Sequence, residues 1–359
     1  MDIDIVLGPA LGRGGVETTV TVIANKLVEQ GHRVRVFQAY PSLYPEWLAS
    51  LPNIQFFGLP DQGPNRNFKQ EAERLRSLFD CQGYPDIVVA THTPFPVLHS
   101  FLALTHLEER RPPIISWLHS PADCYEAAEA LQLADAHLAI SRRVGESIRR
   151  YVPPDQPIFY VGNPVVLDGV SPIPRTQSDV LNFLYIGRLD IGDKRVDLLF
   201  SALALVRGDF HLHVIGDGFS RHSLMALASA KGIQSKITWY GWLRDPWTVV
   251  SSADLLILPS AYEGFGMVLV EALARGVPLV ASKTEGPEEI VTEDVGWLFP
   301  PGDVLSLAEI LQGIVSRELP LPSPEACVAS AMRYDVDRVL ERFTEALRTV
   351  VKQRKGIVM

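Results

Sequence analysis

The strongest chemical signal in the sequence is a pair of glutamates, Glu263 and Glu271, with seven residues between them. A short loop of Gly264, Phe265 and Gly266 follows the first of them. Glycines let backbone N–H groups approach a ligand closely, and such groups at a helix N-terminus favour anions. Carboxylates accept hydrogen bonds from hydroxyl groups. An acidic pair beside an anion-binding loop therefore suits a ligand with both hydroxyls and phosphates.

The neighbouring residues predict how this pair is positioned. The apolar run 255–258 is typical of a buried parallel strand, and 267–274 consists of strong helix formers that a glycine and a proline then end. Glu263 is thus expected on a loop at the carboxyl end of a strand. Glu271 is expected in the following helix, about two turns on and near the same azimuth. Solvated glutamates on an ordinary strand-loop-helix are the alternative.

Two cations form a second signal. Arg188 follows the predicted strand 183–186, and Lys194 stands six residues later, just before the amphipathic helix 196–205. Two cations on one strand-to-helix loop suit a diphosphate leaving group, because fixed positive charges stabilise the negative charge that such a group gains in the transition state. Surface charges without a ligand are the alternative.

The N-terminal residues predict another ligand-binding unit. Strand 3–7, the glycine-rich loop 8–15 and helix 16–29 form the start of a βαβ unit whose loop favours anions. The loop lacks the GxGxxG spacing and no acid follows the second strand, which argues against an NAD-dependent dehydrogenase. His119 follows another predicted strand, at the kind of carboxyl end where open α/β sheets bind ligands. His92 has a similar place but is the weaker candidate.

The order of these motifs resembles the glycosyltransferases of family 4, which are retaining enzymes with the GT-B fold. The likeness runs through the glutamate, the Gly-Phe-Gly, the second glutamate in EALA and the Gly-Val-Pro turn, and extends over most of the chain. It implies an α/β protein of two Rossmann-like domains that face a central cleft. The expected domains are 1–172 for the acceptor, joined by a C-terminal helix at 335–355, and 178–334 for a nucleotide sugar.

The resemblance also implies a role for each candidate. Glu263 would hold the sugar, His119 would position it, and Glu271 would bind the ribose. Arg188 and Lys194 would stabilise the diphosphate. The other donor-binding positions that it implies are Gly14, Gly15, Gly241, Trp242, Leu243, Gly264, Phe265 and Gly266. GT-B enzymes generally need no metal, so no metal or other cofactor is expected, and the two Asp-x-Asp sequences at 2–4 and 335–337 are interpreted as structural.

A narrower resemblance points to the galactosyltransferases of the lipopolysaccharide core. Four segments carry it, namely HLAIS, GRLDIGDKRV, HLHVIGDG and ITWYGWLRDPW. A hexosyltransferase with a UDP-hexose donor, galactose above all, and a glycan or glycolipid acceptor is therefore expected. A glucosyl-, N-acetylglucosaminyl- or mannosyltransferase of the same family remains an alternative, as does a subunit that binds a nucleotide sugar without turnover.

Composition sets the broader limits. A chain of 359 residues with 47% hydrophobic content suits two domains, and the net charge of −9 argues against a general nucleic-acid binder. Three scattered cysteines fit a reducing compartment, and neither a signal peptide nor a spanning stretch is evident. A cytoplasmic protein is expected. Four arginines share one side of the predicted helix 141–152 and could contact anionic lipid of the inner membrane, although a solvated charged face is the favoured interpretation.

Overall fold

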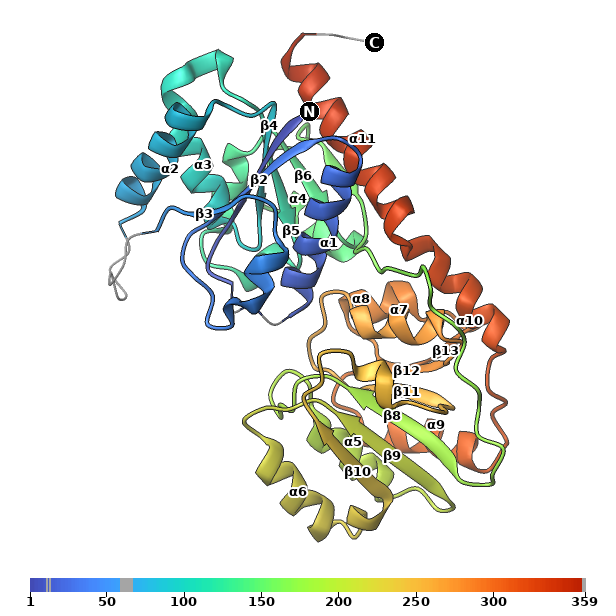
Figure 1. Ribbon diagram of the computed structural model, residues 1–359. Helices are drawn as coiled ribbons and strands as arrows, with labels where there is room; N and C mark the ends of the chain where they lie inside the picture. Colours follow the sequence, from blue (N-terminus) through green and yellow to red (C-terminus); the bar gives the residue numbers. More distant parts are fainter. Residues whose placement is uncertain (11, 13, 59–66, 357–359) are drawn as a thin grey trace. The chain divides into compact units, whose positions relative to one another are not determined.

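The computed structural model describes residues 1–10, 12, 14–58 and 67–356. The chain divides into two compact units, which we call unit 1 (Met1–Pro164 with Val336–Met359) and unit 2 (Val165–Asp335). Residues 165–172, counted with the first domain in the sequence analysis, thus belong to unit 2. Each unit is built on one parallel sheet with helices packed on it (Figure 1).

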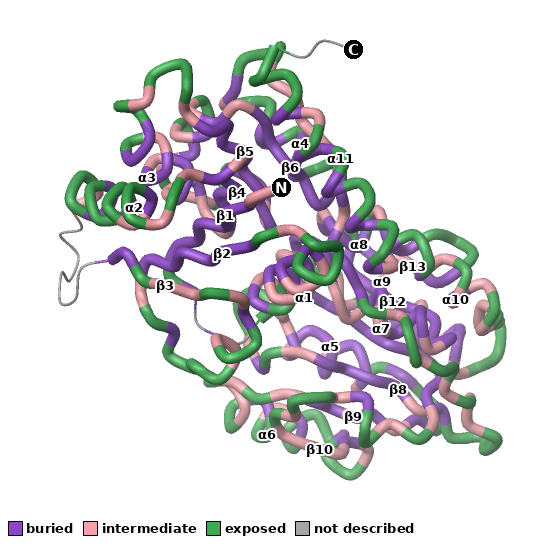
Figure 2. The backbone as a smooth tube through the Cα atoms, turned by 45° about the horizontal axis from the view of Figure 1, so that its top comes forward, coloured by how far each residue is buried: buried purple, intermediate pink, exposed green. Residues whose placement is uncertain are grey.

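The sheet of unit 1 has the strand order β3-β2-β1-β4-β5-β6-β7. Its central strands read as continuous apolar runs because both faces are covered, and Figure 2 shows them buried. The bounds are β1 Asp2–Leu7, β2 Arg33–Gln38, β3 Ile54–Phe56, β4 Ile87–Thr91, β5 Ile114–Leu118, β6 Ala136–Ala139 and β7 Ile158–Tyr160. The edge strands β3 and β7 are the two that the sequence did not predict.

The helices of unit 1 pack on this sheet. Their bounds are α1 Gly15–Glu29, α2 Phe68–Gln82, α3 Phe95–Leu104, α4 Arg142–Arg149 and α11 Val336–Arg354. Short 3₁₀ segments lie at Pro45–Ser50 (η1), Thr105–Arg110 (η2), Ala122–Cys124 (η3) and Ala128–Leu133 (η4).

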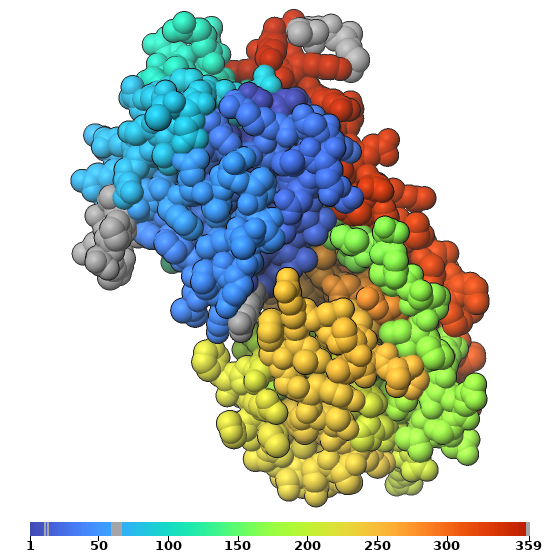
Figure 3. Space-filling view, viewed as in Figure 1, coloured from blue at the N-terminus to red at the C-terminus, as the bar shows by residue number. Residues whose placement is uncertain are grey.

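The helix α11 returns from the end of the chain to the first unit, as the sequence predicted. Its buried residues recur at helical spacing, so one apolar stripe faces unit 1. Phe343 packs edge-on against Trp117 of β5, with ring centroids 4.9 Å apart, and the Arg342 guanidinium donates to the carbonyl of Val161. The red helix runs on the outer surface of unit 1 in Figure 3.

The sheet of unit 2 has the strand order β10-β9-β8-β11-β12-β13. A hydrophobic core fills the space between one face and α5, α6 and α9, while α7 packs against α10. The strands are β8 Leu181–Ile186, β9 Phe210–Ile215, β10 Ile237–Gly241, β11 Leu255–Leu258, β12 Leu279–Ser282 and β13 Gly296–Phe299. The helices are α5 Val196–Leu203, α6 Arg221–Ala230, α7 Met267–Ala274, α8 Glu285–Ile290, α9 Val304–Val315 and α10 Pro324–Ala331, with 3₁₀ segments at Gln234–Lys236 (η5), Pro246–Val249 (η6) and Met332–Tyr334 (η7).

Candidate active site

The loops that leave β8 and β11 bring Lys194 and Glu263 together. The two strands are neighbours in the sheet of unit 2, and both loops leave from their carboxyl ends. Lys194 Nζ lies 2.5 Å from Glu263 Oε2, and the two side chains are 22% and 14% exposed. A backbone bond of 2.7 Å from Ala261 N to the carbonyl of Asp193 ties the loops together. The structure thus places a carboxylate and an ammonium group in direct contact at the edge of the sheet where such folds bind ligands.

The same loop after β8 holds Arg188 apart from this pair. Its guanidinium lies 3.1 Å from the carboxylate of Asp193, and both side chains are more than half exposed. Asp190 accepts the backbone N–H groups of Gly192 and Asp193, and these bonds lower the pKa of its carboxyl group. Arg188 is therefore a solvent-facing cation on an ordered loop, and it does not contact Glu263 in this structure.

The glycine loop after Glu263 is fixed by close packing. Gly266, at φ 88°, caps α7 with a left-handed conformation that glycine adopts at little cost. Phe265 is buried edge-on against Tyr334. A Cβ on Gly286 would stand only 2.2 Å from the backbone of Phe265, so α8 packs directly onto the loop. Close packing therefore fixes the position of the loop at the start of α7.

Glu271 has a different partner from Glu263. Its Oε2 accepts the indole N–H of Trp247 at 3.0 Å, and the guanidinium of Arg275 lies 4.3 Å above the indole ring. Burial raises the pKa of Glu271, with the Trp247 hydrogen bond opposing that shift. Because α7 begins at Met267, Glu263 lies on the loop and Glu271 in the helix, as predicted, and their shared azimuth stays a prediction. No local sequence pattern relates Trp247 to Glu271, which are 24 residues apart.

The exit loops of β9 and β10 lie side by side at the same edge. Gly241, at φ 75°, ends β10 and accepts the backbone N–H of Gly216, which follows β9. Trp242 is half exposed and Leu243 is partly buried. These residues follow β10, which β9 separates from β8, and their binding of a base stays a prediction.

Unit 1 holds the remaining candidates, and it places both glycines at the start of α1. Gly14 is the N-cap residue and Gly15 is the first helical residue. Gly12 donates its backbone N–H to the buried carboxylate of Glu17 at 2.8 Å. Residues 11 and 13 of the predicted glycine loop lie outside the described residues.

His119 is buried directly after β5, and its protonation state follows from its neighbours. The hydroxyl of Thr91 donates to the carbonyl of Trp117 and lies 3.0 Å from His119 Nε2, so Nε2 carries the hydrogen and donates to that hydroxyl. Burial, with a smaller effect of nearby His92, lowers the pKa of His119 to about 3, and a side-chain hydrogen bond with Asn163 opposes that shift. The imidazole is therefore neutral at pH 7, and its Nδ1 is a buried hydrogen-bond acceptor.

Several other sequence features are engaged elsewhere. In the basic helix α4, Arg149 donates to two backbone carbonyls and Arg150 pairs with Asp123 at 2.6 Å, which favours a structural role for that half of the face. Asp4 forms a buried bidentate pair with Arg35. Among the described residues we find no helix able to span a bilayer, and no group of three or more histidines, cysteines or acids arranged for a metal ion.

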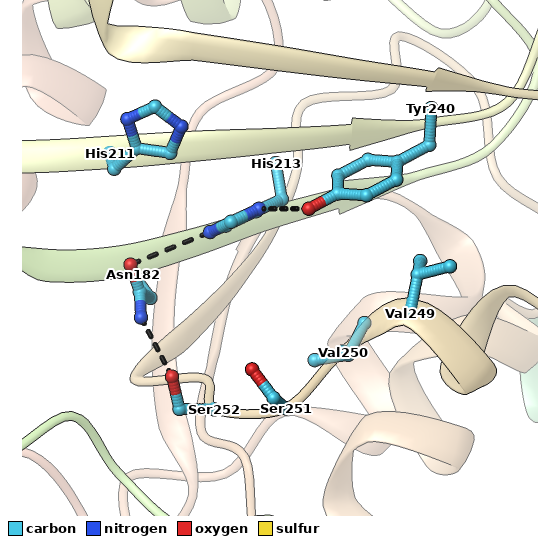
Figure 4. A pocket seen from close by; sticks show the side chains of 8 residues that line it. All are labelled: Asn182, His211, His213, Tyr240, Val249, Val250, Ser251 and Ser252. Atoms are coloured by element: carbon cyan, nitrogen blue, oxygen red, sulfur yellow. Dashed lines mark hydrogen bonds between the residues drawn. The ribbon is translucent and has the colours of Figure 1, made fainter.

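A polar pocket in unit 2 lies toward the amino ends of β8 and β11, at the opposite edge from Lys194 and Glu263 (Figure 4). His213 contacts the hydroxyl of Tyr240 at 2.9 Å and the side-chain oxygen of Asn182 at 3.4 Å, and Asn182 donates to Ser252. These groups satisfy one another, so the pocket is interpreted as a structural network.

The fold of each unit and the polar groups at the carboxyl edge of each sheet define a class of protein, and comparisons with known proteins agree. Residues 13–168 match the model "Glycosyltransferase Family 4", and residues 172–332 match "Glycosyl transferases group 1". A solved structure described as "lipopolysaccharide outer core galactosyltransferase WaaB apo form" superposes with a TM-score of 0.87 at 27% identity, covering 97% of this chain and 99% of that chain. Anabaena Alr3699/HepE in complex with UDP gives a TM-score of 0.80 at 20% identity, covering 97% of this chain and all of that chain.

The protein is therefore a glycosyltransferase with the GT-B fold, and the fold class predicted from the sequence is confirmed. Two curated relatives show which members of the family the chain resembles. Lipopolysaccharide 1,6-galactosyltransferase of Escherichia coli K12 is 32% identical over 251 residues, which are 68% of this chain and 69% of the relative. The corresponding protein of Salmonella typhimurium is 37% identical over 213 residues, 57% of this chain and 59% of the relative. The chain belongs to glycosyltransferase family 4.

Proposed function

We propose that this chain is a retaining hexosyltransferase that moves galactose from UDP-galactose to a hydroxyl of a glycan acceptor in lipopolysaccharide core synthesis. The contact between Lys194 and Glu263 is the observation that carries the proposal, because it joins a diphosphate-binding cation to a hydroxyl-binding carboxylate. The likeness to the two lipopolysaccharide 1,6-galactosyltransferases supports the choice of sugar and acceptor.

The proposed reaction breaks the bond between the anomeric carbon and the diphosphate oxygen, and forms a bond from the same carbon to the acceptor oxygen. The acceptor's proton passes to the departing diphosphate on the same face of the sugar, which retains the configuration. Arg188, Lys194 and the N–H groups beginning α1 and α7 stabilise the charge that collects on the diphosphate. The proposed mechanism requires no metal ion.

Three side chains would hold the donor. Glu263 accepts hydrogen bonds from sugar hydroxyls, and its charge favours a developing oxocarbenium ion. Lys194 lies against it, so the cation and the carboxylate are placed to bind a phosphate and a hydroxyl of one donor. Glu271, oriented by the indole N–H of Trp247, binds the ribose. The neutral His119 accepts a hydrogen bond from the sugar.

Binding and turnover with several donors test the proposal. Purified protein is incubated with UDP-galactose, UDP-glucose, UDP-N-acetylglucosamine and GDP-mannose, and both affinity and slow nucleotide release are measured. Preference for UDP-galactose, followed by transfer to a truncated lipopolysaccharide core, is the expected result. Preference for another sugar would retain the family and replace the galactosyl assignment. Tight binding with no release or transfer would favour a non-catalytic nucleotide-sugar-binding subunit.

The cellular location that we propose follows from the donor and acceptor assigned above. A donor made in the cytoplasm and an acceptor carried on lipid place the reaction at the cytoplasmic face of the inner membrane, with at most peripheral attachment of the protein. Flotation with vesicles of anionic or neutral lipid tests that attachment. Replacement of Arg142 and Arg143, which lie at the start of α4, by glutamine would reduce binding to anionic vesicles if the basic face is used.

A further inference from the structure

His92 has a backbone conformation that its residue type does not favour. It directly follows β4 and has φ 83°, in the left-handed region where a side chain is strained. Such strain persists only where the surrounding structure enforces it, and it concentrates at functional positions. His92 lies at the carboxyl edge of the sheet of unit 1. His119 follows the neighbouring strand β5 at the same edge.

Polar atoms without partners gather at this edge. Within the described chain, His92 Nδ1 and Thr93 Oγ1 are buried and have no hydrogen-bond partner, and His119, which bonds to Thr91 through Nε2, has Asn163 as a further hydrogen-bonding neighbour. A Cβ built on Gly8 would stand 3.5 Å from Thr93 Oγ1 and 3.9 Å from His92 Nδ1, so both atoms face the side of Gly8 that carries no side chain. Buried polar groups are nearly always paired, so the two unpaired atoms beside His119 are available to a hydrogen-bonding ligand.

The charge state of these groups selects the kind of ligand. Burial lowers the pKa of His92, with Glu17 opposing the shift, and burial also lowers the pKa of His119. Both imidazoles are neutral at pH 7, and threonine has no charge. An anion such as phosphate would gain no charge-assisted bond here, whereas sugar hydroxyls can both donate and accept.

We propose that His92, Thr93 and Nδ1 of His119 form a subsite of unit 1 that binds the hydroxyls of a sugar, beside Gly8, which carries no side chain. The inference rests on the proposed glycosyl transfer and adds His92, Thr93 and Gly8 to its machinery. The sugar is either that of the donor or that of the acceptor, and the two differ in the reaction step that they affect.

His92→Gly separates a binding role from a structural one. Glycine relieves the strain at φ 83°, so the variant should be at least as stable as the wild type, while the hydrogen-bonding group is lost. We expect kcat/KM to fall about tenfold or more, in line with the loss of one hydrogen bond. Glu108→Gly is the matched control, because Glu108 has φ 52° and is exposed, and it should leave kcat/KM unchanged.

Two further variants probe the subsite without touching the backbone strain. Thr93→Val removes the hydroxyl at constant shape, and Gly8→Ala places a methyl group at van der Waals distance from both polar atoms. Each should lower kcat/KM about tenfold with little change in melting temperature. Thr344→Val is the control for Thr93, since the Thr344 hydroxyl is also buried without a partner but lies in α11.

The readouts separate the two sugars and isolate the inference. A loss in the slow hydrolysis of UDP-galactose without acceptor assigns the subsite to the donor sugar, and a loss confined to transfer onto a truncated lipopolysaccharide core assigns it to the acceptor. Affinity for UDP should stay at the wild-type value in every variant. His92→Gly and Thr93→Val with wild-type kcat/KM in both reactions would overturn the inference, whereas a wild type that neither binds nor cleaves any nucleotide sugar would overturn the proposed function itself.

Discussion

Replacing both members of the Lys194–Glu263 pair tests whether the contact serves stability, chemistry or both. The perturbations are Lys194→Met, Glu263→Gln and the double variant, each of which removes charge at nearly constant size. The side chains are only 22% and 14% exposed, so a single replacement leaves the other charge poorly solvated and without its partner. Exposed pairs contribute about 0–1 kcal/mol, and breaking a buried pair costs about 3–5 kcal/mol. For this intermediate burial we expect each single variant to lose about 1–3 kcal/mol.

The double variant should recover much of that stability, because it leaves no unpaired charge. The coupling free energy between the two positions is then about 1–2 kcal/mol, within the range for residues in contact. Activity should behave differently. Each single variant is expected to lower kcat by about 10²–10³, as for loss of one group that stabilises transition-state charge, and the double variant should be no faster. Lys26→Met with Glu29→Gln, an exposed pair in α1, is the control, and it should change neither quantity appreciably.

The assays are thermal or urea unfolding for stability and initial rates of nucleotide release for activity. A unit of this size shifts its melting temperature by about 2–4 °C per kcal/mol, so the single variants are resolvable. Recovery of both stability and activity in the double variant would refute the chemical roles and leave a purely structural ion pair. Failure of stability to recover would refute the pairing itself.

Three further results are expected. Glu271→Gln and Trp247→Phe should each raise the KM for the donor about tenfold with a smaller change in kcat, because both weaken one donor-binding contact; an effect on kcat alone would contradict that role. The unfolded chain protonates His119 near pH 6.5 and the folded chain only near pH 3, so the free energy of unfolding falls as the pH drops between these values. In His119→Gln, urea titrations at pH 4–6 should give a slope of unfolding free energy against pH that is smaller by about 1.4 kcal/mol per pH unit. A slope equal to that of the wild type would contradict the assignment of a neutral imidazole. Gly286→Ala should destabilise unit 2 by about 1–3 kcal/mol, since its Cβ would meet the backbone of Phe265 at 2.2 Å, and a wild-type melting temperature would show that α8 can shift.

Local sequence patterns predicted which residues of the site lie on loops. The apolar run before Glu263 and the helix formers after Gly266 predict the strand, loop and helix that the structure contains, and α7 has the predicted bounds. The same local rules predict the loop after β8 that carries Arg188 and Lys194. The domain organisation also followed, because two successive series of strands and glycine-rich turns each suit one parallel sheet.

Local sequence patterns did not predict the shortest strands. The edge strands β3 and β7 have three residues each, which is too few to establish a hydrophobic period, and they exist because β2 and β6 offer them backbone partners. The described part of the segment between β2 and α2 contains β3 and the 3₁₀ segment η1.

By itself the sequence determined which residue types stand at the carboxyl ends of strands, since strand, glycine and helix signals act over a few neighbouring residues. Tertiary structure alone decided which of those residues meet. Lys194 reaches Glu263 across 69 residues, Trp247 orients Glu271, and Thr91 sets the hydrogen position on His119. Contacts of this kind depend on strand order and side-chain packing, which bring together groups that no local pattern relates, and the electrostatics of the site depend on the burial that results.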